Sequence, residues 1–411
     1  MNYRIDHRRT CRICTSPRVK SFLRFDDMPF TDEFVASDRI GTEFRAQIEI
    51  FWCEECRTVQ TQHDVEVSDY YRDYQYTVSA SNFARQFMTQ LAEATWQRFD
   101  LQAGDSVIEI GSGDGFQLAC FQKLGARVLG YEPSDDLTRM SLDAGVPVVK
   151  CLFHAGTTGE IPQEMRPAQV VLLTYTFDHL PEPLPFLHAV RDVLDPDRGV
   201  LLIEVHDLAK IMQRRETCLF EHEHSIYLTA KTMDALLARA GFRLLTTMLL
   251  PEERRRGNSL LIAAALAESR HQPDVSIDMA VLNPYDQWQV YAQFGGEVQN
   301  AYANMRAYVH SQIIAGKSLA GYGAGGRGVM TLAMAGLTHH EIAYLCDRNS
   351  SFHGLYTPGS HIPVVPPEQL VRDPVDELIV FSFGYLDEIR QQQSEFVARG
   401  GQITSMLELL R

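Results

Sequence analysis

Residues 107–115 read Val107-Ile108-Glu109-Ile110-Gly111-Ser112-Gly113-Asp114-Gly115, an apolar run that enters three glycines at alternate positions. The apolar run predicts a buried strand, and the pattern of residues 116–124 predicts a helix directly after the loop. Glycines between a strand and a helix let the backbone come close to a bound ligand. This order is typical of the first unit of an α/β domain.

The alternation of strands and helices continues on both sides of this loop. Residues 83–99 repeat apolar positions at helical spacing. Further strands are predicted at residues 127–131, 146–150, 170–173 and 200–205. Such alternation implies a parallel sheet with helices on both faces. We expect this α/β, Rossmann-like domain to span residues 76–265.

Two smaller domains are predicted to flank it. Residues 1–75 are rich in cysteine, aspartate and aromatic residues, with a strand-like run at 47–52, and are too few for a large core, so that a metal would help to hold them. Residues 266–295 form a polar connector. A helix at 298–314 and a strand at 319–323 then restart the α/β pattern, which predicts a second, smaller Rossmann-like domain over residues 266–411.

Composition excludes several functional classes. The chain of 411 residues has a formal net charge of −15, which argues against a nucleic-acid-binding protein. No apolar run reaches the roughly 20 residues of a membrane span, and the N-terminus lacks the apolar region of a secretory signal. We therefore expect a cytoplasmic protein without a membrane partner, and a monomer. The run Arg254-Arg255-Arg256 is expected to be a solvated loop rather than an anion site.

Two cysteine pairs predict a metal centre. Cys11 and Cys14 form one C-x2-C pair, and Cys53 and Cys56 form another after 38 intervening residues. Each pair can present two thiolates from a tight turn, and two pairs complete the tetrahedron that Zn²⁺ prefers. Four thiolates leave no open position, so the site should be structural. The remaining cysteines are expected to be single thiols: Cys120, Cys151, Cys218 and Cys346.

The glycine loop predicts a cofactor. Glu132 ends the next strand, 21 residues beyond Gly111, where a carboxylate can accept hydrogen bonds from ribose hydroxyls. An NAD(P) site is the alternative, but Glu109 and Asp114 would repel a pyrophosphate, whereas a sulfonium carries positive charge. The spacing E-x-G-x-G-x-G resembles class I methyltransferases, and the resemblance implies S-adenosylmethionine (AdoMet) bound by Glu109, Gly111, Gly113, Asp114, Gly115, Glu132 and Pro133.

A polar cluster follows the strand at 200–205. Residues 220–227 contain Glu221, His222, Glu223 and His224, and histidine is the usual general base near neutral pH. The alternative is an exposed helix start that Thr229 caps. His179 lies just past the strand at 170–173, beside the expected cofactor. Tyr74 and Tyr76 precede the first long helix and could also pack between domains.

The chain resembles the sugar C-methyltransferases that act on nucleotide-linked 4-keto-deoxysugars in antibiotic and surface-polysaccharide biosynthesis. The resemblance covers nearly the whole chain. It rests on the two cysteine pairs, the glycine loop, the cluster at 220–227 and three C-terminal stretches at residues 321–328, 347–349 and 356–363.

The resemblance implies a reaction and a site. A histidine base matching His224 removes the C3 proton made acidic by the 4-ketone, and C3 accepts the methyl group; Glu223 assists. The other catalytic residues it implies are Tyr76, His179 and Glu221. The nucleotide-diphosphate sugar would be held by Tyr76, Tyr175, His222, Tyr322, Gly323, Arg327, Arg348, Tyr356 and His361.

The chain departs from the family pattern near the implied substrate site. The family usually has tyrosine where Glu221 stands, and asparagine where Tyr175 and Val329 stand. The departures leave the cofactor and zinc motifs intact. Two alternatives stay open, namely an O- or N-methyltransferase on the same scaffold and a non-enzymatic zinc-bearing binding protein.

Overall fold

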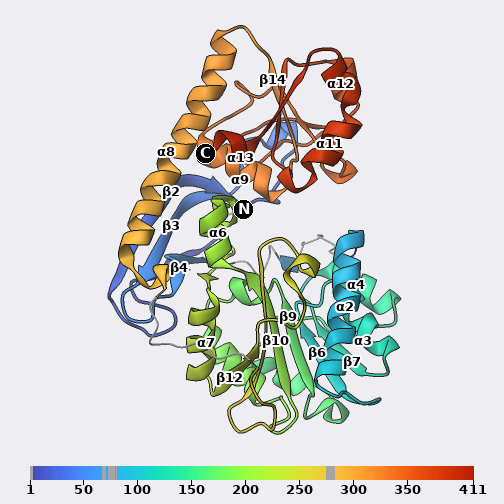
Figure 1. Cartoon of the computed structure of the whole chain (residues 1–411). Helices are drawn as coiled ribbons and strands as arrows, with labels where there is room; N and C mark the ends of the chain where they lie inside the picture. Colours follow the sequence, from blue (N-terminus) through green and yellow to red (C-terminus); the bar gives the residue numbers. More distant parts are fainter. Residues whose placement is uncertain (1–2, 67–70, 73–78, 80, 275–282) are drawn as a thin grey trace.

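The largest sheet of the computed structural model has seven strands and lies in the lower part of the molecule as drawn in Figure 1. The structure describes residues 3–66, 71–72, 79, 81–274 and 283–411. The strand order is β12-β13-β10-β9-β6-β7-β8. The bounds are β6 Ser106–Ile110, β7 Arg127–Tyr131, β8 Val148–Val149, β9 Val170–Thr174, β10 Val200–His206, β12 Phe242–Thr246 and β13 Ser259–Leu266. The strands predicted at 127–131, 170–173 and 200–205 are confirmed, and that predicted at 146–150 shrinks to two residues.

The five predicted strands of this sheet are parallel, as expected, and one further strand is not. β13 runs antiparallel to both β10 and β12, while β6, β7, β8, β9 and β10 are parallel. An antiparallel strand can return directly beside its neighbour without a crossover helix. All eight residues of β13 are buried, so the strand lacks the alternation of buried and exposed residues that is typical of antiparallel strands. The sequence therefore contains no indication of its antiparallel direction.

Helices cover both faces of this sheet because alternate strand residues are apolar on both sides. The helices are α2 Asn82–Arg98, α3 Phe116–Lys123, α4 Asp135–Asp143, α5 Pro183–Arg191, α6 Leu208–Arg214 and α7 Ala230–Arg239. Val107 belongs to the core beneath α2 and α3, whereas Ile108 belongs to the core beneath α5 and α7. The side chain of Thr229 accepts a hydrogen bond from Thr232 N at the start of α7, so the expected cap is confirmed.

The N-terminal domain is built from two small sheets. β1 (Ile5–His7) pairs with β5 (His63–Val65), and the other sheet has the order β11-β4-β3-β2. Its strands are β2 Val19–Pro29, β3 Arg45–Cys53, β4 Val59–Thr61 and β11 Ile226–Tyr227. β11 lies in the segment after β10 and pairs with β4, so the polar cluster at 220–227 is hydrogen-bonded to the N-terminal sheet. Thr61 Oγ1 donates to the His224 carbonyl oxygen at 2.6 Å.

The C-terminal domain is a five-stranded parallel sheet in the order β16-β15-β14-β17-β18. This order reverses between β14 and β17, which creates the crevice where α/β folds bind ligands. Its elements are α8 Trp288–Ile314, β14 Leu319–Tyr322, α9 Gly326–Ala335, β15 Leu345–Cys346, β16 Val364–Val365, α10 Gln369–Arg372, β17 Glu377–Val380, α11 Leu386–Gln392, α12 Ser394–Ala398, β18 Gln402–Ser405 and α13 Met406–Leu409.

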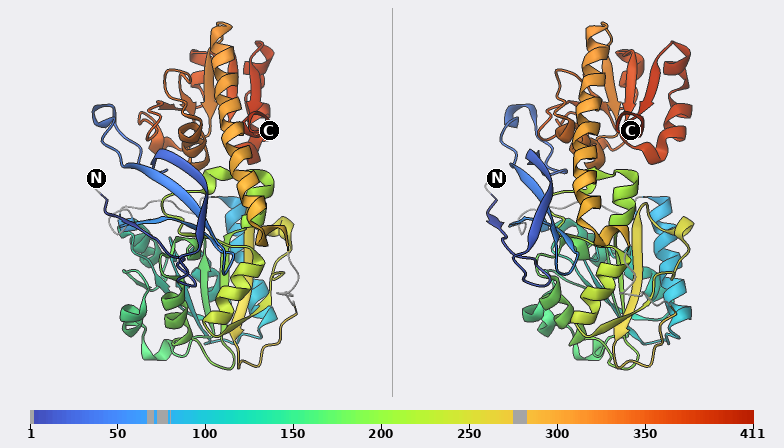
Figure 2. Two further views of the ribbon diagram at one scale, coloured as in Figure 1. Left: turned by 90° about the vertical axis from the view of Figure 1, so that its left-hand side faces the viewer. Right: turned by 60° about the vertical axis from the view of Figure 1, so that its left-hand side comes forward.

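Helix α8 begins ten residues earlier than the predicted helix at 298–314 and joins the domains. Figure 2 shows it running alongside β2 and β3 and on into the C-terminal domain. A Cβ at Gly295 would collide with the carbonyl oxygen of Phe22, so glycine permits the close approach of helix and strand. Trp52 and Tyr291 pack with ring centroids 5.8 Å apart in the shared core.

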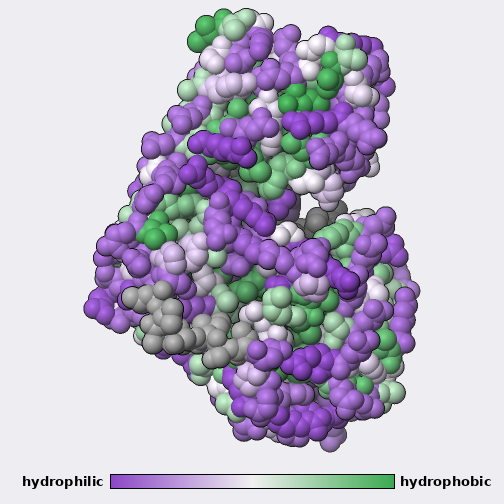
Figure 3. Space-filling view, viewed as in Figure 1, coloured by the Kyte–Doolittle hydropathy of each residue, from purple (hydrophilic) through white to green (hydrophobic). Residues whose placement is uncertain are grey.

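The surface is notched between the C-terminal domain and the seven-stranded domain below it, above the first turn of α2 (Figure 1 and Figure 3). The glycine loop of the C-terminal domain reaches the seven-stranded domain, because a Cβ at Gly257 would lie 3.8 Å from Arg327 Nη2. Among the described residues, no helix is both long enough and apolar enough to cross a membrane.

Candidate functional site

The four predicted metal ligands come together in the N-terminal domain. Their sulfur atoms all lie within 4.8 Å of one another, with 3.5 Å between Cys11 and Cys56 Sγ and between Cys14 and Cys53 Sγ. Four soft thiolate donors at this spacing fit a tetrahedral zinc ion and leave no position for water. The cluster is therefore a structural zinc site. The cysteines outside it are free thiols, as expected.

The cofactor loop lies where β6 ends. Gly111 has a φ of +71°, and a Cβ there would collide with the Thr176 side chain. Gly113 has a φ of +55°, and a Cβ there would enter open space. The loop thus presents bare backbone to a space beside the strand end, which is the cradle that a ligand needs.

Two carboxylates border this space. Glu132 accepts hydrogen bonds from Gly113 N and Ser134 N, both at 2.9 Å, which hold its carboxylate at the end of β7. Glu109 Oε2 is buried without a hydrogen-bond partner among the described residues. Burial raises the pKa of Glu109 well above its usual range, and Arg256 opposes that shift. Hydroxyl-binding carboxylates around an open glycine loop fit AdoMet, with its ribose and its cationic sulfonium.

A cluster of three histidines and one aspartate follows β9 and β10. His206 ends β10, and its Nδ1 lies 2.9 Å from Asp178 Oδ2. His179 Nε2 lies 3.9 Å from Asp178 Oδ1. The His224 ring centroid lies 4.8 Å from that of His179 and 5.1 Å from that of His206. The structure therefore brings together His179 and His224, which were predicted, with Asp178 and His206, which were not.

The tautomer of His224 is fixed by the backbone. Its Nδ1 lies 2.7 Å from the Leu219 carbonyl oxygen, which can only accept, so Nδ1 carries the proton. The neutral ring therefore keeps its lone pair on Nε2, the nitrogen needed by a general base. Glu221 and Glu223 precede His224 closely in the sequence, and Glu223 is only 8% exposed. Burial raises the pKa of Glu221 well above its usual range, and the charge of Glu223 adds to this shift.

Burial governs the other histidines of the cluster. It lowers the pKa of His179 to about 3, with a further contribution from His224. His179 Nδ1 also lies 2.8 Å from the hydroxyl of Tyr71. Burial lowers the pKa of His206 as well, although Asp178 opposes the shift. His179 is consequently neutral near pH 7.

Tyr175 closes the cluster from the sheet side. It has a φ of +53°, a left-handed conformation that is rare for a bulky side chain and costs of the order of 1–3 kcal/mol. Its ring lies 4.5 Å from that of His206 and 4.6 Å from the Arg256 guanidinium. Arg256 in turn is paired with the fully buried Glu204. The expectation of a solvated arginine run is therefore wrong for Arg255 and Arg256, since Arg255 is also buried and donates to the Leu250 carbonyl oxygen, whereas Arg254 is exposed.

Several predicted substrate residues lie away from the cluster. Both ring nitrogens of His222 are occupied, by His63 Nε2 at 2.9 Å and by the Met28 carbonyl oxygen at 2.8 Å. His361 is paired with the buried Glu43, and Tyr356 forms a β-bridge with Val35. These contacts dock the stretch 356–363 on the N-terminal domain. Tyr74 and Tyr76 lie outside the described residues.

The remaining predicted residues gather at the carboxyl edge of the C-terminal sheet. Tyr322 ends β14, Gly323 follows with a φ of +101°, and the Arg327 guanidinium lies 5.0 Å from the Phe383 ring in the loop after β17. The Tyr322 hydroxyl is buried without a hydrogen-bond partner among the described residues. Arg348 is exposed and paired with Glu388. Gly323 and Arg327 thus flank the point where the strand order reverses.

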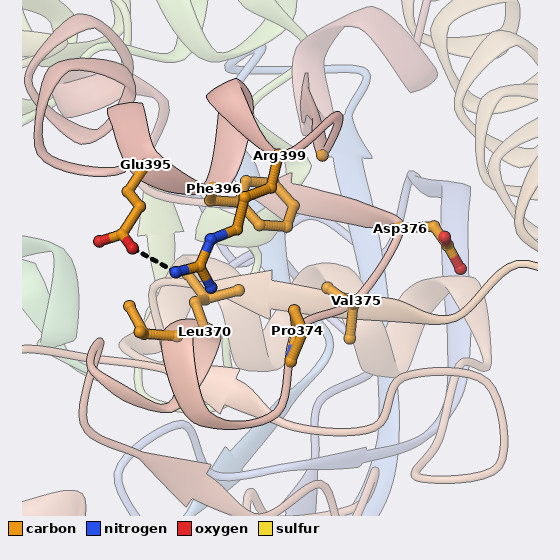
Figure 4. Close-up of a pocket in the computed structure, with 9 residues that line it drawn as sticks. Leu370, Pro374, Val375, Asp376, Glu395, Phe396 and Arg399 are labelled. Carbon is orange, nitrogen blue, oxygen red and sulfur yellow. Dashed lines mark hydrogen bonds and ion pairs between the residues drawn. The ribbon is translucent and has the colours of Figure 1, made fainter.

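A separate pocket of about 230 Å³ opens at the opposite edge of this sheet (Figure 4). Val375 and Asp376 precede β17, and Gly401 precedes β18, so the pocket lies at the amino ends of the strands. Two of its charged side chains, Glu395 and Arg399, form an ion pair with each other. The pocket belongs to the far side of the domain from the glycine loop, and takes no part in the site.

Comparison with known proteins matches this architecture. Residues 11–71 match a family described as a zinc binding domain, residues 80–247 one described as a methyltransferase domain, and residues 256–407 one described as a C-methyltransferase C-terminal domain. The chain is 27% identical over 396 residues to the C-methyltransferase NovU of Streptomyces niveus. The aligned region covers 95% of this chain and 93% of NovU.

Two shorter similarities concern part of the chain. An uncharacterized methyltransferase of Bacillus pumilus is 30% identical over 105 residues, which are 25% of this chain and 48% of that protein. The structure of the CcbJ methyltransferase from Streptomyces caelestis aligns with a TM-score of 0.35 and 17% identity, over 49% of this chain and 96% of that one.

The fold and the cofactor loop define a class I, AdoMet-dependent methyltransferase with an N-terminal zinc-binding domain of four cysteine ligands. The chain belongs to the C-methyltransferase family in which this core is followed by a C-terminal α/β domain. It is a C-methyltransferase that acts on a small-molecule acceptor.

Proposed function

We propose that the protein methylates C3 of a nucleotide-linked 4-keto-deoxysugar, with His224 as the base that removes the C3 proton. The observation that carries this proposal is the hydrogen bond from His224 Nδ1 to the Leu219 carbonyl oxygen at 2.7 Å, which leaves the Nε2 lone pair within the cluster of His179, His206 and Asp178. A C–H group next to a ketone is acidic enough for an imidazole to deprotonate when the enolate is stabilised in place.

The residues of the chain divide the work of this reaction. His224 accepts the proton, and Glu223 is the neighbouring carboxylate that assists it. His179, with Tyr71 at its Nδ1, supplies polar groups at the position where the enolate oxygen would lie. AdoMet, held by the loop at 111–115 with Glu109 and Glu132, supplies an electrophilic methyl group when bound. Bringing enolate and methyl donor together provides much of the rate enhancement.

The C-terminal domain is proposed to hold the nucleotide diphosphate. The loop at 323–328 leads into α9, whose N-terminus has no side-chain cap, and Arg327 projects from that first turn. Backbone N–H groups at a helix start and a neighbouring guanidinium form an anion site. Support for a sugar substrate comes from the similarity to NovU across 95% of the chain.

The test is to incubate the purified protein with AdoMet and a panel of TDP- and GDP-linked 4-keto-6-deoxysugars. We expect mass spectrometry to show the gain of one methyl group and NMR to place it on C3. His224→Asn should lower turnover by about 100-fold or more, in the range of a lost general base, while AdoMet affinity stays unchanged. A methyl group on oxygen, or a His224→Asn variant with wild-type turnover, contradicts the proposal.

A further inference from the structure

Asp178 occupies a central place among the histidines of the site. One carboxylate oxygen lies 2.9 Å from His206 Nδ1, and the other lies 3.9 Å from His179 Nε2. Ligand atoms of Asp178, His206 and His224 all lie within 4.8 Å of one another. The Asp178 side chain is 4% exposed. A buried carboxylate surrounded by imidazoles is costly unless a positive charge forms beside it.

The hydrogen bonds of Asp178 are incomplete. Oδ2 accepts from His206, but Oδ1 has no hydrogen-bond donor among the described residues. Burial by itself raises the pKa of this carboxyl group, but the hydrogen bond and charge of His206 outweigh burial, so the pKa falls below its usual range. Asp178 is therefore ionised at neutral pH and retains capacity for one more charged neighbour.

The backbone holds Asp178 independently of its side chain. Ser225 N donates to the Asp178 carbonyl oxygen at 2.7 Å, which ties the loop after β9 to the segment that carries His224. A side-chain substitution that keeps the shape of aspartate therefore leaves this connection intact. The titratable groups that interact with Asp178 are His206, His179, His224, Glu221, Tyr71, Tyr175 and Tyr227. Glu223 and Arg327 lie beyond them and act on Glu221.

We propose that Asp178 is a positioning residue that stabilises the imidazolium formed on His224 during proton abstraction, and that it orients His206 by accepting the Nδ1 proton. The inference rests on the proposed function of His224. In the step, the C3–H bond breaks, its electron pair moves into the enolate, and the proton passes to His224 Nε2. The new positive charge lies beside the Asp178 carboxylate, and the proton later leaves to solvent.

Low local dielectric makes this charge pairing effective. A carboxylate within about 4–6 Å of an imidazole shifts the proton equilibrium by about 1–3 pH units in favour of the charged ring. The same geometry supports a second interpretation, in which two histidines and a carboxylate bind a divalent cation. A cation on His224 Nε2 would block the base, so zinc stoichiometry separates the two.

The experiment compares Asp178→Asn with Asp207→Asn as the matched control. Asp207 is a half-buried carboxylate that directly follows β10, and it caps α6 by accepting from Ala209 N, a role that asparagine fills equally well. For Asp178→Asn we expect kcat to fall by about 100-fold with little change in KM, the acidic limb of the pH–rate profile to move about one unit or more to lower pH, and AdoMet affinity and zinc content to stay unchanged. Asp207→Asn should behave as wild type.

A second variant keeps the proposal testable if asparagine disturbs folding. Asp178→Ala should regain turnover on addition of formate, a response that a purely structural role would not give. An unshifted pH–rate profile in Asp178→Asn, no rescue by formate, or a second zinc equivalent that is lost in Asp178→Asn would overturn the inference. If wild-type protein methylates oxygen, or if His224→Asn is fully active, the proposed function itself fails instead.

Discussion

Arg12 donates a hydrogen bond from Nη1 to the carbonyl oxygen of Pro181 at 2.9 Å. The same guanidinium binds Asp64 at 2.9 Å and the Thr61 carbonyl oxygen at 2.8 Å, and its side chain is fully buried. Arg12 lies between the first two zinc ligands, and Pro181 lies two residues after His179. The zinc knuckle is thus connected directly to the loop that carries Asp178 and His179 of the proposed catalytic cluster.

Replacing Arg12 should impair that connection. Arg12→Met removes one of the two arginines that pair with Asp64 and leaves Arg8 as its partner. It also removes the buried donor to the carbonyl oxygens of Pro181 and Thr61, at a cost of about 1–3 kcal/mol. We expect a lower free energy of unfolding in urea and about tenfold lower turnover, with AdoMet affinity preserved. Arg18→Ala is the control, because Arg18 is 60% exposed in its pair with Glu55. Equal effects of the two substitutions would argue against a specific role for Arg12.

Removing the metal should destabilise the N-terminal domain more than the methyltransferase domain. Cys53 is fully buried and its Sγ faces that of Cys14, so Cys53→Ser should abolish zinc binding and expose the domain to proteolysis. Elemental analysis should give one zinc per wild-type chain and none in the variant. Cys346→Ser, at a buried thiol outside the cluster, should retain the metal. A zinc-free wild-type protein with an unchanged melting temperature would refute the structural role.

The cofactor site gives a prediction for binding alone. Glu132→Ala removes the carboxylate that Gly113 N and Ser134 N hold at the loop. A charged hydrogen-bond acceptor contributes about 1.5–3 kcal/mol, so we expect AdoMet affinity to fall by about 10–100-fold in calorimetry. Glu164→Ala, in the 3-10 helix Gln163–Met165, should bind as wild type. Unchanged affinity in Glu132→Ala would place the cofactor elsewhere.

Acid should weaken the interface between the N-terminal domain and the segment at 220–227. Burial lowers the pKa of His63 to about 4 and that of His222 to about 3, whereas the unfolded value is 6.5. Below pH 6.5 these two histidines bind protons in the unfolded chain but remain neutral in the folded chain. The free energy of unfolding therefore falls as the pH decreases from about 6.5 toward 4. Urea unfolding at several pH values measures this. A His63→Asn variant should show a shallower decline; an equally steep one would contradict the assignment.

Local patterns predicted the parts of the molecule that are specified locally. The C-x2-C pairs, the glycine loop and most central strands follow from spacing and periodicity, because each is set by neighbours in the sequence. Asp178 and His206 escaped notice because they are 28 residues apart and meet only at the edge of the sheet. A lone histidine at a strand end and an aspartate in a short loop carry no distinctive pattern by themselves.

At two other places, contacts with distant parts of the chain contradict what the local sequence predicted. Arg256 stands in a run of three arginines, a pattern typical of a solvated loop, yet it is paired with Glu204, 52 residues away. The stretch at 356–363 resembles a family signature and was expected to touch the substrate, but His361 and Tyr356 contact the N-terminal domain. In both cases the partner lies in another domain or strand, so sequence proximity gave no indication of the contact.

The most direct test of C-methylation by His224 is solvent-deuterium exchange at C3 of a nucleotide-linked 4-keto-6-deoxysugar, followed by NMR without AdoMet. A base that forms the enolate must exchange the C3 proton before any methyl group is transferred. The wild-type protein should therefore incorporate deuterium at C3, and His224→Asn should not. Absence of exchange by the wild-type protein on a sugar that it methylates, or undiminished exchange by His224→Asn, would contradict the account.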